Sequence, residues 1–198
     1  MIKILKKLKD KPYLKFYEYY KEAINVEQSH IESIAISSYC SLTKTVNSRF
    51  VNLKYIDSNR WTFFTNYNSS KAIEFEKHKQ ISALFYWNKI NLQIRIKADI
   101  KKSDEIFSDN HFKSRSIEKN ALAISSKQSE EISSYDLVKK NYYNSLNKGN
   151  LDKRPEYWGG YDFIPYSFEF WTGENNRLNK RELFIFHDNL WRESFLQP

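Results

Sequence analysis

The sequence predicts an α+β protein in which an antiparallel β-barrel is decorated with helices. Three observations predict this fold. Short runs rich in β-branched and aromatic residues are separated by polar turns, as in antiparallel strands that follow one another along the chain. Segments with apolar side chains at helical spacing interrupt these runs. No internal repeat and no linker rich in Pro, Gly or Ser divides the sequence, so we expect a single domain over residues 1–198.

The first half of the chain supplies one long helix and most of the strands. A lysine-rich arm, residues 1–12, precedes a predicted amphipathic helix over Tyr13 to Asn25. From Ser33 onwards strands are expected, separated by turns such as Asp57-Ser58-Asn59. These strands cover residues 34–42, 48–56, 60–67, 81–87 and 92–100. A helix is predicted between the third and fourth strands, over Ser69 to Lys79, because serines are good helix caps.

The second half of the chain begins with helices and ends with strands. Helices are predicted over Ser103 to Ile124 and Ser134 to Leu146, with a polar stretch between them. The last strands are expected over Ser167 to Trp171, Glu182 to His187 and Leu190 to Leu196. The final two form a hairpin through Asp188-Asn189, which is a favourable turn sequence.

The composition limits the partners and the compartment. Lys plus Arg minus Asp plus Glu is 32 − 24 = +8, which favours anionic partners such as small phosphates or nucleic acid. Lysine and asparagine are frequent everywhere, however, a pattern more often due to genome composition than to a binding surface. Cys40 is the only cysteine, so we expect no disulfide and a reducing, cytoplasmic compartment. No apolar run is long enough to span a bilayer, and the first residues do not read as a secretory signal.

Several common catalytic motifs are missing from the sequence. It contains neither a glycine-rich dinucleotide motif nor a Walker-type phosphate loop. The four histidines lack metal-ligand spacing, so no metal is expected. The sequence has only four glycines, and Gly159, Gly160 and Gly173 lie in one window between Trp158 and Leu183. This window is therefore the most unusual part of the chain.

Cations that emerge from strands are the more promising features. In SRFVNLK, strand alternation places Arg49 and Lys54 on opposite faces. This suits a strand that borders both a ligand and a partner chain, although an edge strand with snorkelling cations is the simpler interpretation. In FFTNYNSSKA, a strand ends near Thr65 and a helix begins near Ser69 with Lys71 in its first turn. Free N–H groups, hydroxyls and a lysine can bind phosphate there, and an ordinary serine cap explains the pattern equally well.

A resemblance distinguishes between these alternatives. The stretch WGGYDFIPYSFEFWTGENNRLNKREL resembles the C-terminal signature of the pyridoxamine 5'-phosphate oxidase family, approximately WGGxxxxPxxxEFWQGxxxRLHDR. Earlier segments resemble other motifs of the family in the right order: SRFVNLK its R-x-V-L-L-K strand, FFTNYNSSKA its YTN-x-x-S-R-K turn, FYWNKINLQIRI its FYW…RQVRI pair, and SSKQSEEIS its S-x-Q-S-x-x-I-S segment. The likeness covers most of the chain from about Leu14 to Pro198.

The resemblance implies a fold, a cofactor and a partner. The fold is an antiparallel split β-barrel, and the partner is a second copy of the chain, with FMN in clefts at the subunit interface. Residues 155–198 correspond to the family's C-terminal dimerisation and active-site region. The matched cofactor-binding positions are Arg49, Leu53, Lys54, Phe64, Thr65, Ser70, Lys71, Gln93, Gln128, Ser129, Trp171 and Arg181.

The resemblance also implies a reaction. In the family, pyridoxamine or pyridoxine 5'-phosphate is oxidised to pyridoxal 5'-phosphate, and oxygen accepts the electrons. The matched substrate-binding positions are Lys54, His111, Arg115, Lys119, Arg177 and Asn179, of which Arg177 and Asn179 occupy the catalytic positions. Most of what these side chains must provide is orientation, since the flavin carries the electron chemistry. We expect no nucleic acid or membrane partner.

Departures from the family pattern lie mainly on the substrate side. Asn179 stands where the family has a histidine, and Lys180 where it has an aspartate. His111 replaces a tyrosine and Lys119 a serine, and Ser70 replaces an arginine beside the FMN phosphate. Three other functions therefore stay open: a flavin oxidase acting on another aromatic compound, an FMN-binding protein without turnover, and a basic nucleic-acid binder that rests on the net charge alone.

Overall fold

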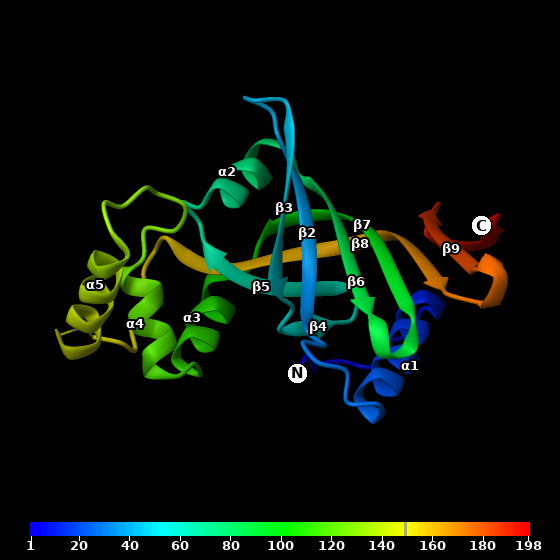
Figure 1. Ribbon diagram of the computed structural model, residues 1–198, viewed down its shortest axis with the longest axis horizontal. Coiled ribbons are helices and arrows are strands. Elements are labelled where there is room, and N and C mark those ends of the chain that lie inside the picture. Colours follow the sequence, from blue (N-terminus) through cyan, green and yellow to red (C-terminus); the bar gives the residue numbers. More distant parts are fainter. Residues whose placement is uncertain (149) are drawn as a thin grey trace.

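A single curved sheet forms the centre of the fold. In the computed structural model, which describes residues 1–148 and 150–198, ten strands join in this sheet (Figure 1). They are β1 (Lys3–Ile4), β2 (Ser33–Cys40), β3 (Thr45–Asn52), β4 (Tyr55–Asp57), β5 (Arg60–Asn66), β6 (Gln80–Trp87), β7 (Leu92–Lys102), β8 (Trp158–Thr172), β9 (Lys180–His187) and β10 (Leu190–Leu196). Every pairing is antiparallel except that of β1 with β4. The predicted α+β fold with an antiparallel barrel is confirmed.

Strand β8 connects the two ends of the sheet. Its residues Tyr161 to Thr172 pair with β7, while its other edge pairs first with β5 and then with β9. A bulge interrupts the β7 register, because Ala98 faces Pro165 whereas Lys97 faces Ser167. Proline donates no hydrogen bond and is tolerated at such a bulge. The strand predicted over Ser167 to Trp171 was therefore much too short. The first half of β8 contains two glycines and this proline, which count against a strand in a prediction from sequence.

Helices cover the barrel and extend it at one end. They are α1 (Lys11–Asn25), α2 (Ser70–Lys77), α3 (Glu105–Lys113), α4 (Ile117–Ser125) and α5 (Tyr135–Lys148). In Figure 1, α3, α4 and α5 gather near the start of β8, whereas β9 lies at the opposite end of the sheet. The predicted helices over Tyr13 to Asn25 and Ser134 to Leu146 are confirmed within about two residues at each end.

Two predicted elements are each divided in the structure. The strand expected over residues 48–56 ends at Asn52, and β4 begins at Tyr55. Between them the side chain of Leu53 is fully buried in the core, and its N–H donates to the carbonyl of Glu32 at 2.9 Å. The helical stretch expected over Ser103 to Ile124 breaks into α3 and α4 around Arg115. Neither break has a glycine or proline to mark it in the sequence.

Aromatic side chains of α1 fill one end of the barrel. Phe16 is fully buried, and its ring centroid lies 4.5 Å from that of Trp61 and 5.7 Å from that of Trp87. Tyr13 and Tyr20 are also buried on the same helix face. Burial of such a side chain contributes roughly 2–3 kcal/mol. The helix is thus held by the aromatic spacing that predicts it.

Close packing explains why glycine occurs in β8. A Cβ atom added at Gly160 would lie 2.5 Å from Oγ and 2.8 Å from Cβ of Ser103, which is itself buried. At Gly173 the added atom would meet only the side chain of Asn91, which is exposed and can rotate away. The glycines of the unusual window therefore answer different needs. Gly160 allows two backbone segments to approach beside the start of β8.

We expect Gly160→Ala to lower the free energy of unfolding by about 1–3 kcal/mol, since Ser103 is buried and its Oγ is hydrogen-bonded to Asp162. Gly173→Ala is the matched control and should cost less, because Asn91 can turn towards solvent. Urea unfolding followed by tryptophan fluorescence measures both changes. Equal costs at the two positions would contradict this explanation.

Candidate functional site

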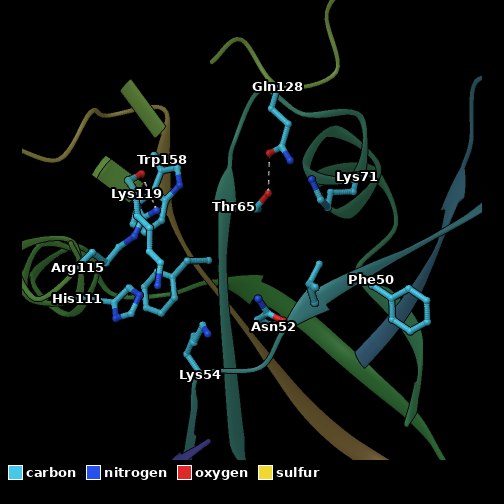
Figure 2. Close-up of a pocket in the computed structure, with 12 residues that line it drawn as sticks. Phe50, Asn52, Lys54, Thr65, Lys71, His111, Arg115, Lys119, Gln128 and Trp158 are labelled. Carbon is cyan, nitrogen blue, oxygen red and sulfur yellow. Dashed lines mark hydrogen bonds between the residues drawn. The ribbon is translucent and has the colours of Figure 1, made fainter. Parts of the chain in front are cut away.

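A polar cavity lies where β5 passes the helical end of the molecule (Figure 2). Its volume is about 280 Å³. Strand β5 forms its floor, the first turn of α2 lies on one side, and the α3–α4 break lies on the other. The lining residues are Phe50, Val51, Asn52, Lys54, Phe64, Thr65, Lys71, His111, Arg115, Lys119, Gln128 and Trp158.

The charge of this cavity is strongly one-sided. Four of its lining side chains are cationic, and among the described lining residues none is a carboxylate. Figure 2 shows the cations in two places: Lys71 on one side of Thr65, and Lys54, Arg115 and Lys119 on the other. Like charges held together in this way favour an anionic ligand that neutralises them. The cavity therefore offers two separate places for anionic groups.

Lys71 is the most buried of the four cations. Its side chain is only 7% exposed, and Nζ donates to Oγ of Ser69 at 3.0 Å. Burial, followed by the nearby charge of Arg49, lowers the pKa of the Lys71 ammonium to about 8. A buried ammonium with one neutral acceptor is poorly compensated. An arriving phosphate would supply the missing charge.

Arg115 is also only partly compensated. Its Nη2 donates to the carbonyl of Lys119 at 2.9 Å, and the guanidinium carbon lies 4.3 Å from the ring centroid of Trp158. The other terminal nitrogen, Nη1, is buried and has no hydrogen-bond partner among the described residues. Burial lowers the pKa of the guanidinium to about 10. The stacked arginine thus has a free donor for a ligand in the cavity.

His111 contributes a neutral ring to the site. Its ring lies 3.7 Å from that of Phe64, nearly parallel to it, and Nδ1 is hydrogen-bonded to the hydroxyl of Tyr55 at 2.9 Å. Burial lowers the pKa of His111 to about 4, and the neighbouring charges of Arg115 and Lys54 act in the same direction. The imidazole is therefore uncharged near pH 7. It can stack on a flat ligand or exchange hydrogen bonds, but it adds no charge.

Gln128 forms the far wall of the cavity. Its Oε1 accepts hydrogen bonds from Oγ1 of Thr65 at 3.1 Å and from the backbone N–H of Asn66 at 3.3 Å. These contacts fix the polypeptide that leads from α4 to α5 against β5. The amide nitrogen is left for other partners.

Four residues predicted as cofactor ligands lie beside the cavity without lining it. Arg49 lies on the face of β3 that also carries Val51 and pairs with Glu74, while Ser70 is exposed at the start of α2. The side chain of Leu53 belongs to the hydrophobic core. Ser129 has a left-handed backbone (φ 75°) and lines a separate cavity beyond Gln128. Their roles stay predictions.

The remaining predicted residues form a second group at the other end of the sheet. Gln93, Trp171 and Arg181 are directly opposite one another on β7, β8 and β9, so they form one row. Nε of Arg181 donates to Oε1 of Glu169 at 2.8 Å. Arg177 and Asn179 lie in the turn before β9. There Oδ1 of Asn179 accepts from the N–H of Glu174 at 3.1 Å. None of these residues lines the cavity of its own chain.

Sequence reasoning missed several lining residues. Phe50 and Asn52 share a strand face with Lys54 by alternation, which was available as a signal. Val51 shares the opposite face with Arg49, a predicted cofactor-binding position, so alternation was a signal there too. Trp158 was recognised only as part of a motif, whereas the structure shows that it supports the guanidinium of Arg115.

In residues 1–148 and 150–198, no three His, Cys, Asp or Glu side chains gather as a metal ion would require. Among the helices that the structure describes, none combines the length and apolar character needed to cross a membrane.

The fold and the cavity define a class of protein: a β-barrel with a cationic cavity between one strand and a broken helix. Family models agree with this description. One described as "Pyridoxamine 5'-phosphate oxidase" matches residues 38–143, and one described as "Pyridoxine 5'-phosphate oxidase C-terminal dimerisation region" matches residues 158–198. The chain belongs to the pyridoxamine 5'-phosphate oxidase family.

Individual relatives are similar over nearly the whole chain. A pyridoxine/pyridoxamine 5'-phosphate oxidase from Psychromonas ingrahamii is 35% identical over 189 residues, which is 94% of this chain and 87% of the relative. One of the same name from Coxiella burnetii is 32% identical over 188 residues, covering 94% of this chain and 95% of the relative.

Solved structures confirm the split-barrel fold. PhzG from Burkholderia lata, in complex with tetrahydrophenazine-1-carboxylic acid, superposes with a TM-score of 0.89 at 24% identity, covering 96% of this chain and 94% of that one. A pyridoxamine 5'-phosphate oxidase-related, FMN binding protein from Nostoc punctiforme gives 0.79 at 12% identity, covering 97% and 100%. At these identities the likeness establishes the fold alone.

We expect Lys71→Met to stabilise the ligand-free protein at pH 7, by at most about 3 kcal/mol. The pKa of Lys71 is lower in the folded state than in the unfolded chain, so the charged ammonium disfavours folding below about pH 8. This cost shrinks as the pH rises from 8 towards 10, where only the folded state loses the proton. Urea unfolding at pH 7 and pH 9.5 should show the advantage of the variant narrowing. The exposed Lys77→Met on the same helix is the control. An advantage that does not change with pH would contradict the assignment.

Proposed function

We propose that the protein is an FMN-dependent oxidase that converts pyridoxamine 5'-phosphate to pyridoxal 5'-phosphate with oxygen as the electron acceptor. Pyridoxine 5'-phosphate is a second possible substrate. The observation that carries this proposal is the pair of cationic places in one cavity free of carboxylates. Both the cofactor and the substrate carry a phosphate, and each needs its own cations.

The residues around Lys71 fit the phosphate of FMN. Lys71 is buried with too little compensation, and the first N–H groups of α2 are close to it. Thr65 and Gln128 add polar contacts along β5. FMN would supply the two-electron acceptor that protein side chains lack. The chain itself would supply binding and orientation.

The residues around Arg115 fit the phosphate of the substrate. Lys54 and Lys119 stand beside the free donor of Arg115, and the His111–Phe64 stack offers an apolar wall for a pyridine ring. The side chains replaced relative to the family pattern, His111 and Lys119, keep the ability to bind phosphate. Their role is to hold the substrate so that its reacting carbon faces the flavin.

A second copy of the chain would complete the site. Phe50, Leu84 and Tyr86 are exposed on the same sheet face as the row of Gln93, Trp171 and Arg181. Phe50 also lines the cavity, so the cavity and the row open onto one face from its two ends. In a twofold-symmetric dimer this face packs on its copy, and the row of one subunit can reach the cavity of the other. Arg177 and Asn179 would arrive with it.

A different aromatic substrate is the second candidate. Asn179 already accepts a hydrogen bond from the backbone of Glu174, so it differs from the family's histidine in chemistry and in freedom to move. The solved relative PhzG holds a tetrahydrophenazine carboxylic acid rather than a vitamin B6 compound. The same barrel can therefore accommodate another ring.

The direct test is an anaerobic titration of the FMN-loaded protein with pyridoxamine 5'-phosphate, followed by the visible absorbance of the flavin. We expect bleaching that reverses when air is admitted, with formation of pyridoxal 5'-phosphate. If the protein binds FMN but its absorbance does not change with either B6 phosphate, another substrate is favoured. If the protein does not bind FMN, the proposal is wrong.

Mixed dimers test whether each site uses two chains. Lys71→Ala removes a cation from the cavity, and Arg177→Ala removes the arginine of the turn before β9. We therefore expect each variant to be nearly inactive as a homodimer. Unfolding the two variants together and refolding them should restore about a quarter of the wild-type activity, because half of the dimers are mixed and each mixed dimer has one intact site of two. No recovery, with mixed dimers shown to form, would indicate that each site lies within one chain.

A further inference from the structure

A buried carboxylate lies directly behind the Lys71 end of the cavity. Glu74 is one helical turn beyond Lys71 on α2, and only 5% of it is exposed. Its Oε1 accepts from Nδ2 of Asn47 at 2.7 Å, and its Oε2 accepts from Oγ of Ser38 and from Nη2 of Arg49 at 3.2 Å. These donors come from β2 and β3, so Glu74 connects the helix to the hairpin.

The contacts of Glu74 restrain Arg49. Besides the bond to Glu74, Nη1 of Arg49 donates to Oγ of Ser38 at 2.5 Å and to the carbonyl of Ile36 at 3.4 Å. Three acceptors thus hold one guanidinium in a single orientation. An arginine without such partners would lose its rotamer freedom only when a ligand arrives, which weakens binding.

Glu74 also allows two cations to stand close together. The charge of Arg49 is strong enough at Lys71 to lower the pKa of that ammonium, and Glu74 acts in the opposite direction. A buried carboxylate costs free energy unless its oxygens are satisfied, and here three donors satisfy them. The network therefore keeps Arg49 and Lys71 together before any anion is bound.

We propose that Glu74 is a positioning residue for the phosphate of the cofactor: it holds Arg49 in the orientation in which Arg49 and Lys71 receive that phosphate as a pair. This inference rests on the proposed FMN site. It assigns no contact between Glu74 and the ligand. It predicts that the effect of Glu74 is specific for the phosphate and does not extend to the isoalloxazine ring.

The test compares the affinities for FMN and for riboflavin, which has the same ring and no phosphate. Flavin fluorescence on titration gives both dissociation constants. Glu74→Ala should weaken FMN binding about tenfold or more, by removing the charged one of the three acceptors that restrain Arg49, and should leave the affinity for riboflavin unchanged within about twofold. Glu74→Gln should stay within about threefold of the wild type for FMN. Its oxygen can still accept from Arg49 and Ser38 if the amide of Asn47 turns over.

Two more variants make the test independent of folding and of net charge. Glu74→Asp keeps the charge but withdraws the carboxylate by one methylene, and it should show the same split between FMN and riboflavin if the Ala variant does not fold. Glu76→Ala removes the same charge from the same helix, where Glu76 pairs with Lys79 and Lys102 instead. We expect its FMN affinity to be close to that of the wild type.

Each other outcome overturns a defined claim. Equal losses for FMN and riboflavin would show that Glu74 only stabilises the fold. Tighter FMN binding by Glu74→Ala would show that the carboxylate opposes the phosphate. A wild-type protein that binds neither flavin would overturn the proposed function, and this inference with it. If the wild-type protein binds FMN but the Glu74 variants do not weaken FMN binding more than riboflavin binding, only the inference about Glu74 is overturned.

Discussion

The pairing of strand β8 along both edges is the constraint on which the structure depends. One strand of fifteen residues carries Trp158 at its start, beside the cavity, and Trp171 near its end, in the second group of predicted residues. Thirteen residues of extended chain separate these side chains, which corresponds to at most about 43 Å. Because β7 pairs with β8 from Tyr161 to Thr172, the strand stays extended between the two groups, which lie at opposite ends of the sheet within one chain. The proposed sharing of the site between two subunits would follow from this sheet geometry.

Electrostatics sets the second constraint. The cavity brings four cations together and compensates them only in part. Arg115 stacks on Trp158 and donates to a carbonyl, Lys71 donates to a hydroxyl, and Nζ of Lys54 lies 3.9 Å from Oε1 of Glu32. Such an arrangement lowers the stability of the ligand-free fold, and the hydrophobic packing of α1 and the barrel offsets this cost. The carboxylate of Glu74 is placed behind the cavity, where it restrains a cation without occupying the space of a ligand.

The sequence predicted the fold class and the helix α1 well, because both depend on side-chain periodicity. It failed where the backbone is held by distant partners. The first half of β8 contains Gly159, Gly160 and Pro165, which count against a strand when they are considered locally. These residues fit a strand here only because of the pairing with neighbouring strands and the close approach of Ser103. The break around Arg115 was missed because it contains no glycine or proline, and Ser116, the N-cap of α4, was not recognised as a helix start.

The sequence motifs predicted the cations of the candidate site, but not the contacts that hold those cations in place. The start of α2 and the cations Lys54 and Arg115 were proposed from the sequence, and the structure places all of them around one cavity. The pairing of Arg49 with Glu74 was not predicted, because the two residues are 25 positions apart and meet only through the packing of α2 on β2 and β3. The support of Arg115 by Trp158 was equally invisible in the sequence, since neither a motif nor a spacing connects a helix break to the start of a strand.

The bulge in β8 has a consequence for every side chain that follows it. Before the bulge the odd-numbered residues Tyr161 and Phe163 face the core, and after it the even-numbered Phe168 and Phe170 do so. The extra residue, Tyr166, therefore reverses the phase of the alternation, while β7 continues unchanged. With one residue fewer, Trp171 would turn inwards, because a shift of one position moves a whole strand to its other face. One extra residue exchanges the inward-facing and outward-facing positions of the strand. It therefore determines which side chains of the C-terminal half of β8 face the outside of the barrel.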